Sequence, residues 1–363
     1  MIKLVKHFQV KDKDMIIGPE SLILITGATG FIGSKVVECL IGHGFRNLRC
    51  FVRPSSNLTR LHQVIGGVSG QRKIEVVTGN LLSMEDCEKA VKDVVAVYHL
   101  AAEGGKSFPS TFMNCVVTTR NLLEASLQNK SFKRFVNVSS FAVYSNKKKP
   151  QRRLLDESCP IDEHPELRGD AYAFAKLKQD QIVIDYWTKH GIPYVIMRPG
   201  AVYGPGNDKI TGRVGIDTFG IFMHLGGSNK IPLTYVDNCA EAIVLAGLVK
   251  GIDGEVFNIV DDDLPSSRRF LSFYKRHVKS FKSVYVPHAL SYLLCYLWEK
   301  YSALSEGQLP PVFSRNEWHA YWKKTRYSNQ KLKTRLGWNP RVPTAEGMRL
   351  FFEACRGKTS YYY

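Results

Sequence analysis

The sequence predicts an α/β protein in which a doubly wound parallel sheet is followed by a smaller, mostly helical C-terminal lobe. Over the first two-thirds of the 363 residues, short apolar runs alternate with amphipathic stretches, the pattern of parallel strands with helices on both faces. A glycine-rich turn joins the first apolar run to the first amphipathic stretch. The last hundred residues differ from the rest, since they are basic and aromatic.

The strands of the main sheet are expected at 22–26, 48–52, 74–77, 96–100, 135–138 and 194–198, and helices are expected at 34–41, 87–91, 116–127 and 172–189. These strands are almost continuously apolar, which fits burial on both faces of a parallel sheet. Beyond the Gly-rich stretch 203–228, two further strands are expected at 233–236 and 256–260, with a helix at 240–249 between them.

The pattern predicts the domain organisation. Residues 1–20 form an N-terminal extension, 21–202 and 229–262 a nucleotide-binding domain, and 203–228 and 263–363 a substrate-binding lobe. An active-site cleft is expected between the two parts, and the sequence contains no internal repeat.

Composition excludes several classes of protein. With 44% hydrophobic and 11% aromatic residues the chain is a folded globular protein. It has neither a signal peptide nor an apolar run long enough for a bilayer span, so a cytoplasmic protein is expected. The eight cysteines form no CxxC pair and no zinc-type spacing. They are expected to be buried, reduced thiols, and no metal site is predicted.

The net charge of +17 is concentrated at the C-terminal end, where residues 264–363 contribute +13. Such an excess fits an anionic or carrier-linked small-molecule substrate, an anionic membrane surface or nucleic acid. The basic residues form no nucleic-acid motif, so no nucleic-acid partner is expected. The apolar stretch 289–298 (ALSYLLCYLW) is interpreted as a buried or substrate-covering helix, with an interfacial membrane contact as the alternative.

The glycine-rich turn predicts a dinucleotide site, and with it a Rossmann-type sheet. It reads Gly27-Ala28-Thr29-Gly30-Phe31-Ile32-Gly33 and lies between the first strand and first helix. Glycines let the backbone approach a pyrophosphate, and the helix N-terminus supplies N–H donors and a positive dipole. We therefore expect Gly27, Thr29, Gly30, Phe31, Ile32 and Gly33 to contact the cofactor.

Arg53 follows the second strand, at the position that reads the adenosine ribose. The segment Cys50–Ser56 contains no acidic residue that would accept the ribose 2′-hydroxyl of NAD. An arginine there would pair with the 2′-phosphate of NADP. NADP is therefore the predicted cofactor, and NAD is the alternative.

These and later motifs resemble the extended short-chain dehydrogenases/reductases, which include NAD-dependent epimerases/dehydratases, 3-beta-hydroxysteroid dehydrogenases and dihydroflavonol reductases. The resemblance covers residues 20–350. Besides the glycine turn it rests on His99-Leu100-Ala101-Ala102, Val138-Ser139-Ser140, Tyr172-Ala-Phe-Ala-Lys176, Arg198-Pro-Gly-Ala-Val-Tyr-Gly-Pro205, Tyr235-Val-Asp-Asn238 and Leu336-Gly-Trp-Asn-Pro340.

The resemblance implies a site. Tyr172, Lys176, Ser140 and Asn114 would be catalytic, and Asn80, Leu81, Leu100, Ala101, Ala102, Tyr172, Lys176 and Pro199 would complete the cofactor contacts. Asn80 replaces the Asp that relatives place near the adenine. Ser140 is preferred to Ser139 because Tyr144 stands four residues after it. His99 is expected to pack within the sheet.

Tyr172 is distinguished by its context, because four tyrosines have a lysine four residues later. Only Tyr172 opens a long helix after the serine strand, with Asp170 as its cap. Moving a hydride onto a carbonyl leaves an alkoxide that needs a proton. Lys176 would stabilise a phenolate, and Ser140 would donate to the reacting oxygen.

An NADP-dependent reductase or dehydrogenase acting on a ketone or secondary alcohol is the leading hypothesis. A sugar-nucleotide epimerase is the alternative, although Lys230 stands where such enzymes often have an arginine. Phe141-Ala142 after Ser140 argues against dehydration. A non-catalytic NADP sensor is disfavoured because Tyr172 and Lys176 are both present. Members of the family often dimerise through the Tyr/Lys helix, so a homodimer is expected.

Overall fold

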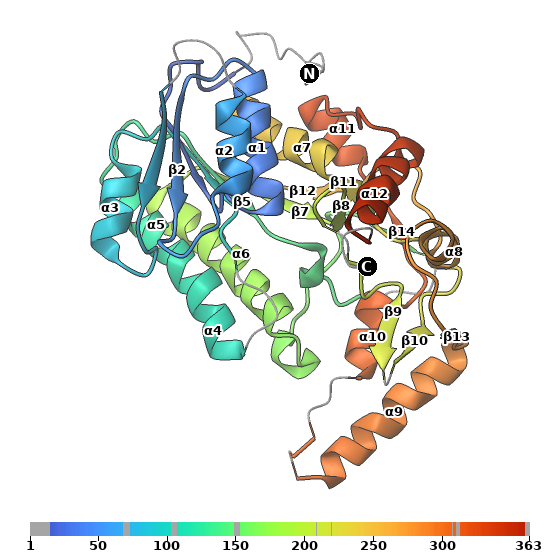
Figure 1. Ribbon diagram of the computed structural model, residues 1–363. Coiled ribbons are helices and arrows are strands. Elements are labelled where there is room, and N and C mark those ends of the chain that lie inside the picture. The colour runs from blue at the N-terminus through green and yellow to red at the C-terminus, as the bar shows by residue number, and fades with distance from the viewer. Residues whose placement is uncertain are drawn as a thin grey trace.

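The structure is a computed structural model (Figure 1) that describes residues 15–67, 73–102, 107–148, 153–207, 209–218, 220–306, 308–309 and 313–359. Most of the predicted N-terminal extension, residues 1–14, lies outside the described residues, as do the last four residues of the chain. The described end of the extension packs against the body, since Ile17 is buried and the Ile16 amide donates to Leu248 O at 2.9 Å.

The elements follow one another in the alternating order that the sequence predicts. The first half contains β1 (Ile23–Thr26), α1 (Phe31–Gly42), β2 (Asn47–Val52), α2 (Thr59–Gly66), β3 (Lys73–Thr78), α3 (Met84–Val91), β4 (Ala96–His99), α4 (Phe108–Phe112), a π turn (Met113–Val117), α5 (Thr118–Ser126), β5 (Arg134–Val138), β6 (Leu154–Leu155), α6 (Ala171–His190) and β7 (Tyr194–Pro199). Short 3₁₀ segments span Phe141–Val143 and Pro165–Arg168.

The second half is less regular. It contains β8 (Ala201–Tyr203), β9 (Gly215–Thr218), β10 (Ile221–His224), β11 (Leu233–Tyr235), α7 (Val236–Leu248), β12 (Glu255–Ile259), α8 (Ser267–His277), β13 (Ser283–Tyr285), α9 (His288–Leu304), α10 (Arg315–Tyr321), β14 (Arg326–Tyr327), α11 (Gln330–Leu336) and α12 (Thr344–Thr359).

Seven strands form the central sheet in the order β12-β7-β5-β4-β1-β2-β3, and every neighbouring pair is parallel. Helices cover both faces (Figure 1). The strand order reverses direction beside β1, where ligands bind in doubly wound sheets. The predicted fold class is confirmed, including the helical C-terminal part. The domain boundaries stay a prediction.

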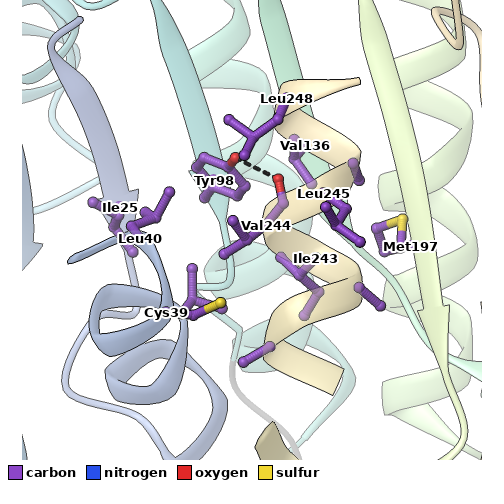
Figure 2. Close-up of a cluster of buried hydrophobic side chains, with 14 of the residues drawn as sticks. Ile25, Cys39, Leu40, Tyr98, Val136, Met197, Ile243, Val244, Leu245 and Leu248 are labelled. Carbon is purple, nitrogen blue, oxygen red and sulfur yellow. Dashed lines mark hydrogen bonds between the residues drawn. The ribbon is translucent and has the colours of Figure 1, made fainter. Parts of the chain in front are cut away.

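Each face of the sheet has its own apolar core. One packs α1 and α7 against the central strands, and the other packs α3, α5 and α6 against the opposite side. In the first core Tyr98 inserts between the sheet and α7, and its hydroxyl donates to Val244 O at 2.8 Å (Figure 2). Gly247 makes this possible, because a Cβ there would lie 2.0 Å from the Tyr98 hydroxyl.

The C-terminal part contains more sheet than the sequence suggests. The Gly-rich region after residue 203 supplies β9 and β10, which join β13 in a three-stranded sheet. β11 pairs with β8 outside the central sheet. An aromatic cluster that includes Phe270, Phe351 and Phe352 packs α8 against α12.

Two helical predictions are corrected. The helix expected at 116–127 is the end of a longer helical run that begins at Phe108, where the Ser107 side chain caps α4 and Pro109 fits the first turn. The stretch 289–298 forms α9, but the interpretation as a buried helix is wrong. Leu290, Leu293, Leu297 and Leu304 face solvent, with Leu293 and Leu297 about half exposed, at 50% and 52%, whereas Leu294 packs against the body. Within the described residues, no helix is both long and apolar enough to cross a membrane.

Candidate active site

The glycine turn between β1 and α1 has the geometry that a dinucleotide requires. Gly27 has a positive φ of 70°, and a Cβ there would come within 2.8 Å of the Ala101 amide nitrogen. A Cβ at Gly33 would lie 2.0 Å from Gly27 O. A Cβ at Gly30, in contrast, would meet only Gly27 O within 4 Å, at 3.1 Å. The side of the turn at Gly30 is therefore open, so that a pyrophosphate fits against the N-terminus of α1.

All the predicted cofactor residues outside α6 gather at one edge of the sheet, because parallel strands end on the same side. β1 ends before Gly27, Thr29, Gly30, Phe31, Ile32 and Gly33; β2 before Arg53; β3 before Asn80 and Leu81; β4 before Leu100, Ala101 and Ala102; and β7 at Pro199. Which of them contact the cofactor stays a prediction.

The side chains of Arg53 and Asn80 differ in whether they already have partners within the protein. Arg53 is exposed, and its guanidinium has no acidic partner in the part of the chain that the structure describes. Its backbone amide is held by Ser56 Oγ at 3.0 Å. The Asn80 side chain is committed locally, since its Oδ1 accepts from the Leu82 amide at 3.0 Å. Arg53 is thus the residue with a charge to offer to the adenosine end of the cofactor.

The start of α6 brings the catalytic candidates together. The Asp170 side chain caps the helix by accepting from the Ala173 amide at 3.0 Å. Tyr172 lies in the first turn and is hydrogen-bonded to the Ser140 hydroxyl. One turn later, Lys176 Nζ lies 6.0 Å from the centre of the Tyr172 ring. Ser140, Tyr172 and Lys176 therefore form one cluster at the end of β5.

The two adjacent serines face different surroundings. Ser139 is buried, and its hydroxyl donates to Asp180 Oδ2 at 2.9 Å inside the protein. Ser140 is only partly buried, and its Oγ accepts from the Ala142 amide at 3.1 Å. Because the hydroxyl hydrogen of Ser140 is not consumed by that bond, Ser140 can donate to an oxygen beside Tyr172. The geometry favours Ser140 over Ser139 as the catalytic serine.

Burial dominates the acid–base properties of the cluster. It raises the pKa of the Tyr172 phenol, and the hydrogen bond from Ser140 opposes this effect. Burial also lowers the pKa of the Lys176 ammonium, whereas Cys115 and Asp180 raise it. The ammonium donates to Val138 O at 2.7 Å and to Gln179 Oε1 at 2.9 Å. These acceptors favour the protonated form of Lys176 and fix its ammonium beside the end of β5.

A buried chain of hydrogen bonds that the sequence did not reveal links Lys176 to the glycine turn. Gln179 Nε2 donates to Thr119 Oγ1 at 2.7 Å, His99 Nε2 lies 2.9 Å from the same oxygen, and His99 Nδ1 lies 2.8 Å from Thr26 Oγ1. The Thr119 hydroxyl itself donates to Cys115 O. His99 must therefore carry its proton on Nε2 and accept from Thr26 on Nδ1.

Burial lowers the pKa of His99 to about 3, so the ring is neutral at physiological pH. Its two hydrogen bonds and its position in β4 agree with the expectation that it packs within the sheet. Through Thr119 and Gln179 it also fixes the position of Lys176 relative to the residue before Gly27.

Asn114 lies in the π turn that interrupts the helix before β5. Such turns widen a helix by one residue and are frequent at functional sites. The side-chain amide of Asn114 donates to Ser110 O at 3.0 Å. Lys176 is held instead by Val138 and Gln179, so the role of Asn114 in placing the lysine and a water stays a prediction.

A second group that the sequence did not reveal surrounds Tyr321 at the end of α10. The Tyr321 hydroxyl donates to Asp170 Oδ2 at 2.7 Å, and the guanidinium carbons of Arg168 and Arg213 lie 4.9 and 5.1 Å from its ring centre. Burial, followed by the charge of Asp170, raises the pKa of Glu317 to about 7. Tertiary contact alone brings Glu317 and Tyr321 beside the catalytic helix, since they lie about 150 positions from Asp170.

The other tyrosine–lysine pairs are engaged elsewhere. The Tyr144 hydroxyl is hydrogen-bonded to Asn258 and Arg198, while Lys148 pairs with Glu163 at 2.7 Å. Tyr296 and Lys300 lie on the exposed side of α9. Lys331, which follows Tyr327, pairs with Glu255 at 2.6 Å. Their surroundings agree with the choice of Tyr172.

One group of metal-binding side chain types exists among the described residues, away from the catalytic cluster. Ligand atoms of Cys39, His43 and Glu241 lie within 4.8 Å of one another. Arg341 Nη2 lies 2.5 Å from Glu241 Oε1, so the carboxylate is already neutralised by a guanidinium. We interpret the group as an ion-pair network between α1 and α7.

The sheet, the open glycine turn and the Ser–Tyr–Lys cluster together define a nicotinamide-dependent enzyme of the Rossmann type. Comparison with known proteins specifies the family. The model of the "NAD dependent epimerase/dehydratase family" matches residues 23–259. The chain belongs to this family, and the predicted membership of the extended short-chain dehydrogenases/reductases is confirmed.

Two curated relatives match over most of their length. One is the 3beta-hydroxysteroid-dehydrogenase/decarboxylase isoform 1 of Arabidopsis thaliana, 24% identical over 91% of this chain and 78% of the relative. The other is the 2-alkyl-3-oxoalkanoate reductase of Stenotrophomonas maltophilia, 26% identical over 90% of this chain and 97% of the relative.

Among solved structures, UDP-glucuronic acid 4-epimerase from Bacillus cereus in complex with NAD has the same fold. Its TM-score is 0.69 with 22% identity, over 93% of this chain and 99% of that one. The family and relatives confirm that the protein is a nicotinamide-dependent enzyme of the oxidoreductase/epimerase type.

Proposed function

We propose that the protein is an NADP-dependent reductase or dehydrogenase that interconverts a ketone and a secondary alcohol with net transfer of a hydride. The observation that carries this proposal is the cluster at the start of α6, where Ser140 is hydrogen-bonded to Tyr172 and Lys176 lies 6.0 Å from the Tyr172 ring. The two relatives that match over about 90% of this chain support it, since their names describe a dehydrogenase/decarboxylase and an oxo-acid reductase.

The roles follow from the atoms available. The nicotinamide, when bound, supplies or accepts the hydride. Ser140 donates a hydrogen bond to the substrate oxygen, and the Tyr172 hydroxyl transfers a proton to that oxygen in reduction or removes one in oxidation. Lys176 stabilises the resulting phenolate through its charge. Thr119 and Gln179 act as positioning residues for the lysine.

Consumption of NADPH with a panel of 3-oxo acids, 3-oxo esters and cyclic ketones tests the proposal. Net oxidation of NADPH in step with alcohol formation supports it. Conversion of a UDP-sugar into its epimer, with no net change in the nicotinamide absorbance, would instead support the epimerase, the alternative for which the UDP-sugar-converting relatives argue. Lys230 is less available to hold a diphosphate, because its Nζ already donates to Leu264 O at 2.7 Å.

The preference for NADP rests on Arg53, and replacing Arg53 with Ala tests it. Loss of a charged hydrogen bond to a 2′-phosphate weakens binding by about 1.5–3 kcal/mol, or roughly 10–100-fold. We expect the Kd for NADPH to rise by that factor while the Kd for NADH changes less than twofold, as measured by fluorescence titration. An equal effect on both cofactors would contradict the assignment of Arg53 to the 2′-phosphate.

We further propose that the protein is a cytoplasmic homodimer. No disulfide joins its eight cysteines, all of which the structure describes as buried, and this fits a reducing compartment.

The dimer is proposed because exposed apolar side chains lie on α4, the π turn and α6: Phe108, Phe112, Met113, Ile184 and Trp187. Pairing of these helices with those of a second copy would cover them, so light scattering should give twice the mass of the chain.

Contact with an anionic membrane surface is proposed for α9, which projects from the body (Figure 1). Its exposed stripe consists of Leu290, Leu293, Leu297, Tyr301 and Leu304, and Leu304 is 81% exposed. The opposite side of α9 packs on the body through small residues, and Ser291 Oγ accepts from Trp318 Nε1 at 2.9 Å. The exposed charged side chains between 276 and 304 are all basic: Arg276, Lys279, Lys282 and Lys300. An apolar stripe flanked by positive charge fits an interfacial helix.

Vesicle sedimentation tests the membrane contact. The wild type should sediment with vesicles containing phosphatidylglycerol, and the double variant Leu293→Glu/Leu297→Glu should lose at least tenfold in bound fraction. Leu154→Glu, at a 44% exposed leucine on β6, is the matched control and should bind normally. If the double variant changes the mass in solution but not vesicle binding, the stripe is an interface between copies and not a membrane contact.

A further inference from the structure

We propose that a cavity in the C-terminal lobe is a second binding site, specific for an amphipathic organic anion: an apolar body that carries a phosphate. The cavity has a volume of about 780 Å³ and lies between α8, α12 and the loop 262–265, with β14 at one end. That volume falls within the range of pockets that bind small organic ligands, about 300–1,000 Å³. The proposal does not depend on the reductase function.

The cavity is separate from the reacting groups. Its lining residues include no member of the glycine turn, and they do not include Ser140, Tyr172 or Lys176. One of its lining residues, Tyr327, stacks its ring on Phe141 with 5.7 Å between centres. Phe141 follows Ser140 in the chain but does not itself line the cavity.

Apolar side chains supply part of the wall. They are Leu264, Pro265, Phe273, Met348 and Phe352, and Phe352 and Met348 also belong to the core between α8 and α12. Because this wall continues the packed core, it offers a preformed surface for an aromatic or aliphatic body. Burial of such a body is favourable because it removes apolar surface from water.

The charges at the cavity favour an anion. Among its acidic side chains, Glu353 is paired with Arg349 at 2.6 Å and Asp262 with Lys333 at 2.7 Å. The guanidinium groups of Arg269 and Arg326 have no acidic partner within the described ranges of the chain. Two cations without a carboxylate partner thus face a cavity whose acids, Asp263 excepted, are already neutralised.

Thr344 gives independent evidence for a polar ligand group. It lines the cavity, is only 5% exposed, and its Oγ1 has no hydrogen-bond partner among the described residues. A buried hydroxyl without a partner is unfavourable, because it has lost its hydrogen bonds to water without gaining another. Thr344 is also the first residue of the 16-residue helix α12, whose N-terminus carries a partial positive charge. A phosphate oxygen beside Thr344 would satisfy the hydroxyl and the helix end together.

Isothermal calorimetry with 1-naphthyl phosphate tests the site. Saturating NADPH is included so that the dinucleotide site is occupied. We expect one molecule to bind per chain, and inorganic phosphate and 1-naphthol, which each lack half of the ligand, to bind at least tenfold more weakly. The Tyr172→Phe variant should bind the probe as the wild type does, which separates this site from the proposed catalytic function.

Single substitutions locate the site. Arg326→Gln and Thr344→Val should each weaken binding of the probe by tenfold or more. Arg349→Gln is the matched control, because its guanidinium lines the same cavity but is held by Glu346 and Glu353, and binding should change less than twofold. Absence of binding, equal binding of 1-naphthol, or an equal loss in Arg349→Gln and Arg326→Gln would each overturn the proposal. Melting temperatures verify that the variants are folded, and Arg269→Gln replaces Thr344→Val if the latter is not.

Discussion

Replacing Tyr172 with Phe is expected to reduce the turnover number by roughly 10²–10⁴-fold, the range that general acid–base catalysis contributes. The substitution removes one oxygen, and with it the proton donor and the hydrogen bond with Ser140. The ring that faces Lys176 remains. We therefore expect cofactor affinity to stay within about twofold of the wild type and the loss to appear in kcat, measured by NADPH consumption and by equilibrium titration of the same preparation.

Tyr186→Phe is the matched control for this experiment. Tyr186 lies on the same helix, and its hydroxyl donates to Glu124 on α5, away from the catalytic cluster. The same chemical change there should leave kcat unaltered. Turnover by Tyr172→Phe at a rate close to the wild type would show that another group moves the proton and would reject the proposed site.

The pH dependence of kcat is a second test of the acid–base role of Tyr172. Burial raises the pKa of Tyr172, so the phenol is protonated at neutral pH and ready to act as an acid in reduction. In the oxidation direction the phenolate is required, and activity should therefore rise with pH. A rise of oxidation, but not of reduction, between neutral and alkaline pH is the expected profile.

The part of the site that local sequence encodes was predictable. The glycine turn and Ser140 each follow the end of a strand, and Tyr172 and Lys176 lie in the first two turns of α6, where the residue types follow from the chemistry of a turn or a helix end. The His99–Thr119–Gln179 chain was not predictable in this way. Its members come from β4, α5 and α6, and only the packing of α5 and α6 on the sheet brings them within hydrogen-bond distance.

The orientation of α9 is a second feature that could not be predicted from the sequence, for a different reason. Leucines recur at 290, 293, 294, 297 and 304, and all but Leu294 fall on one exposed stripe of the helix. The spacing alone does not say whether the stripe faces the body. The small residues Ser291, Cys295 and Ser302 are buried against the body instead. Ser291 and Cys295 pack beside Trp318 of α10, and Ser302 donates to Leu309 O. An apolar stripe therefore identifies a helix face that needs a partner without identifying the partner.

Asp180, on α6, holds residues of β5 and β7 by hydrogen bonds next to the active site. Its replacement by Ala is expected to lower the free energy of unfolding by about 3–5 kcal/mol. Its buried carboxylate accepts from Asn137 Nδ2 at 3.1 Å, from Ser139 Oγ at 2.9 Å and from Arg198 Nη2 at 3.1 Å. Arg198 is only 5% exposed. Without Asp180, the positive charge of Arg198 would remain buried with no carboxylate beside it. An unpaired buried charge destabilises the protein more than removal of both partners of the pair would.

Urea unfolding measures this effect, and two variants make it specific. Asp185→Ala, at an exposed position of the same helix, should change stability by less than about 0.5 kcal/mol. The double variant Asp180→Leu/Arg198→Met removes both charges and should recover much of the loss, since apolar residues replace a buried pair at little cost. If Asp180→Ala costs no more than Asp185→Ala, the buried carboxylate does not hold β5, α6 and β7 together. The alignment of Ser140 with Tyr172 would then depend on other contacts.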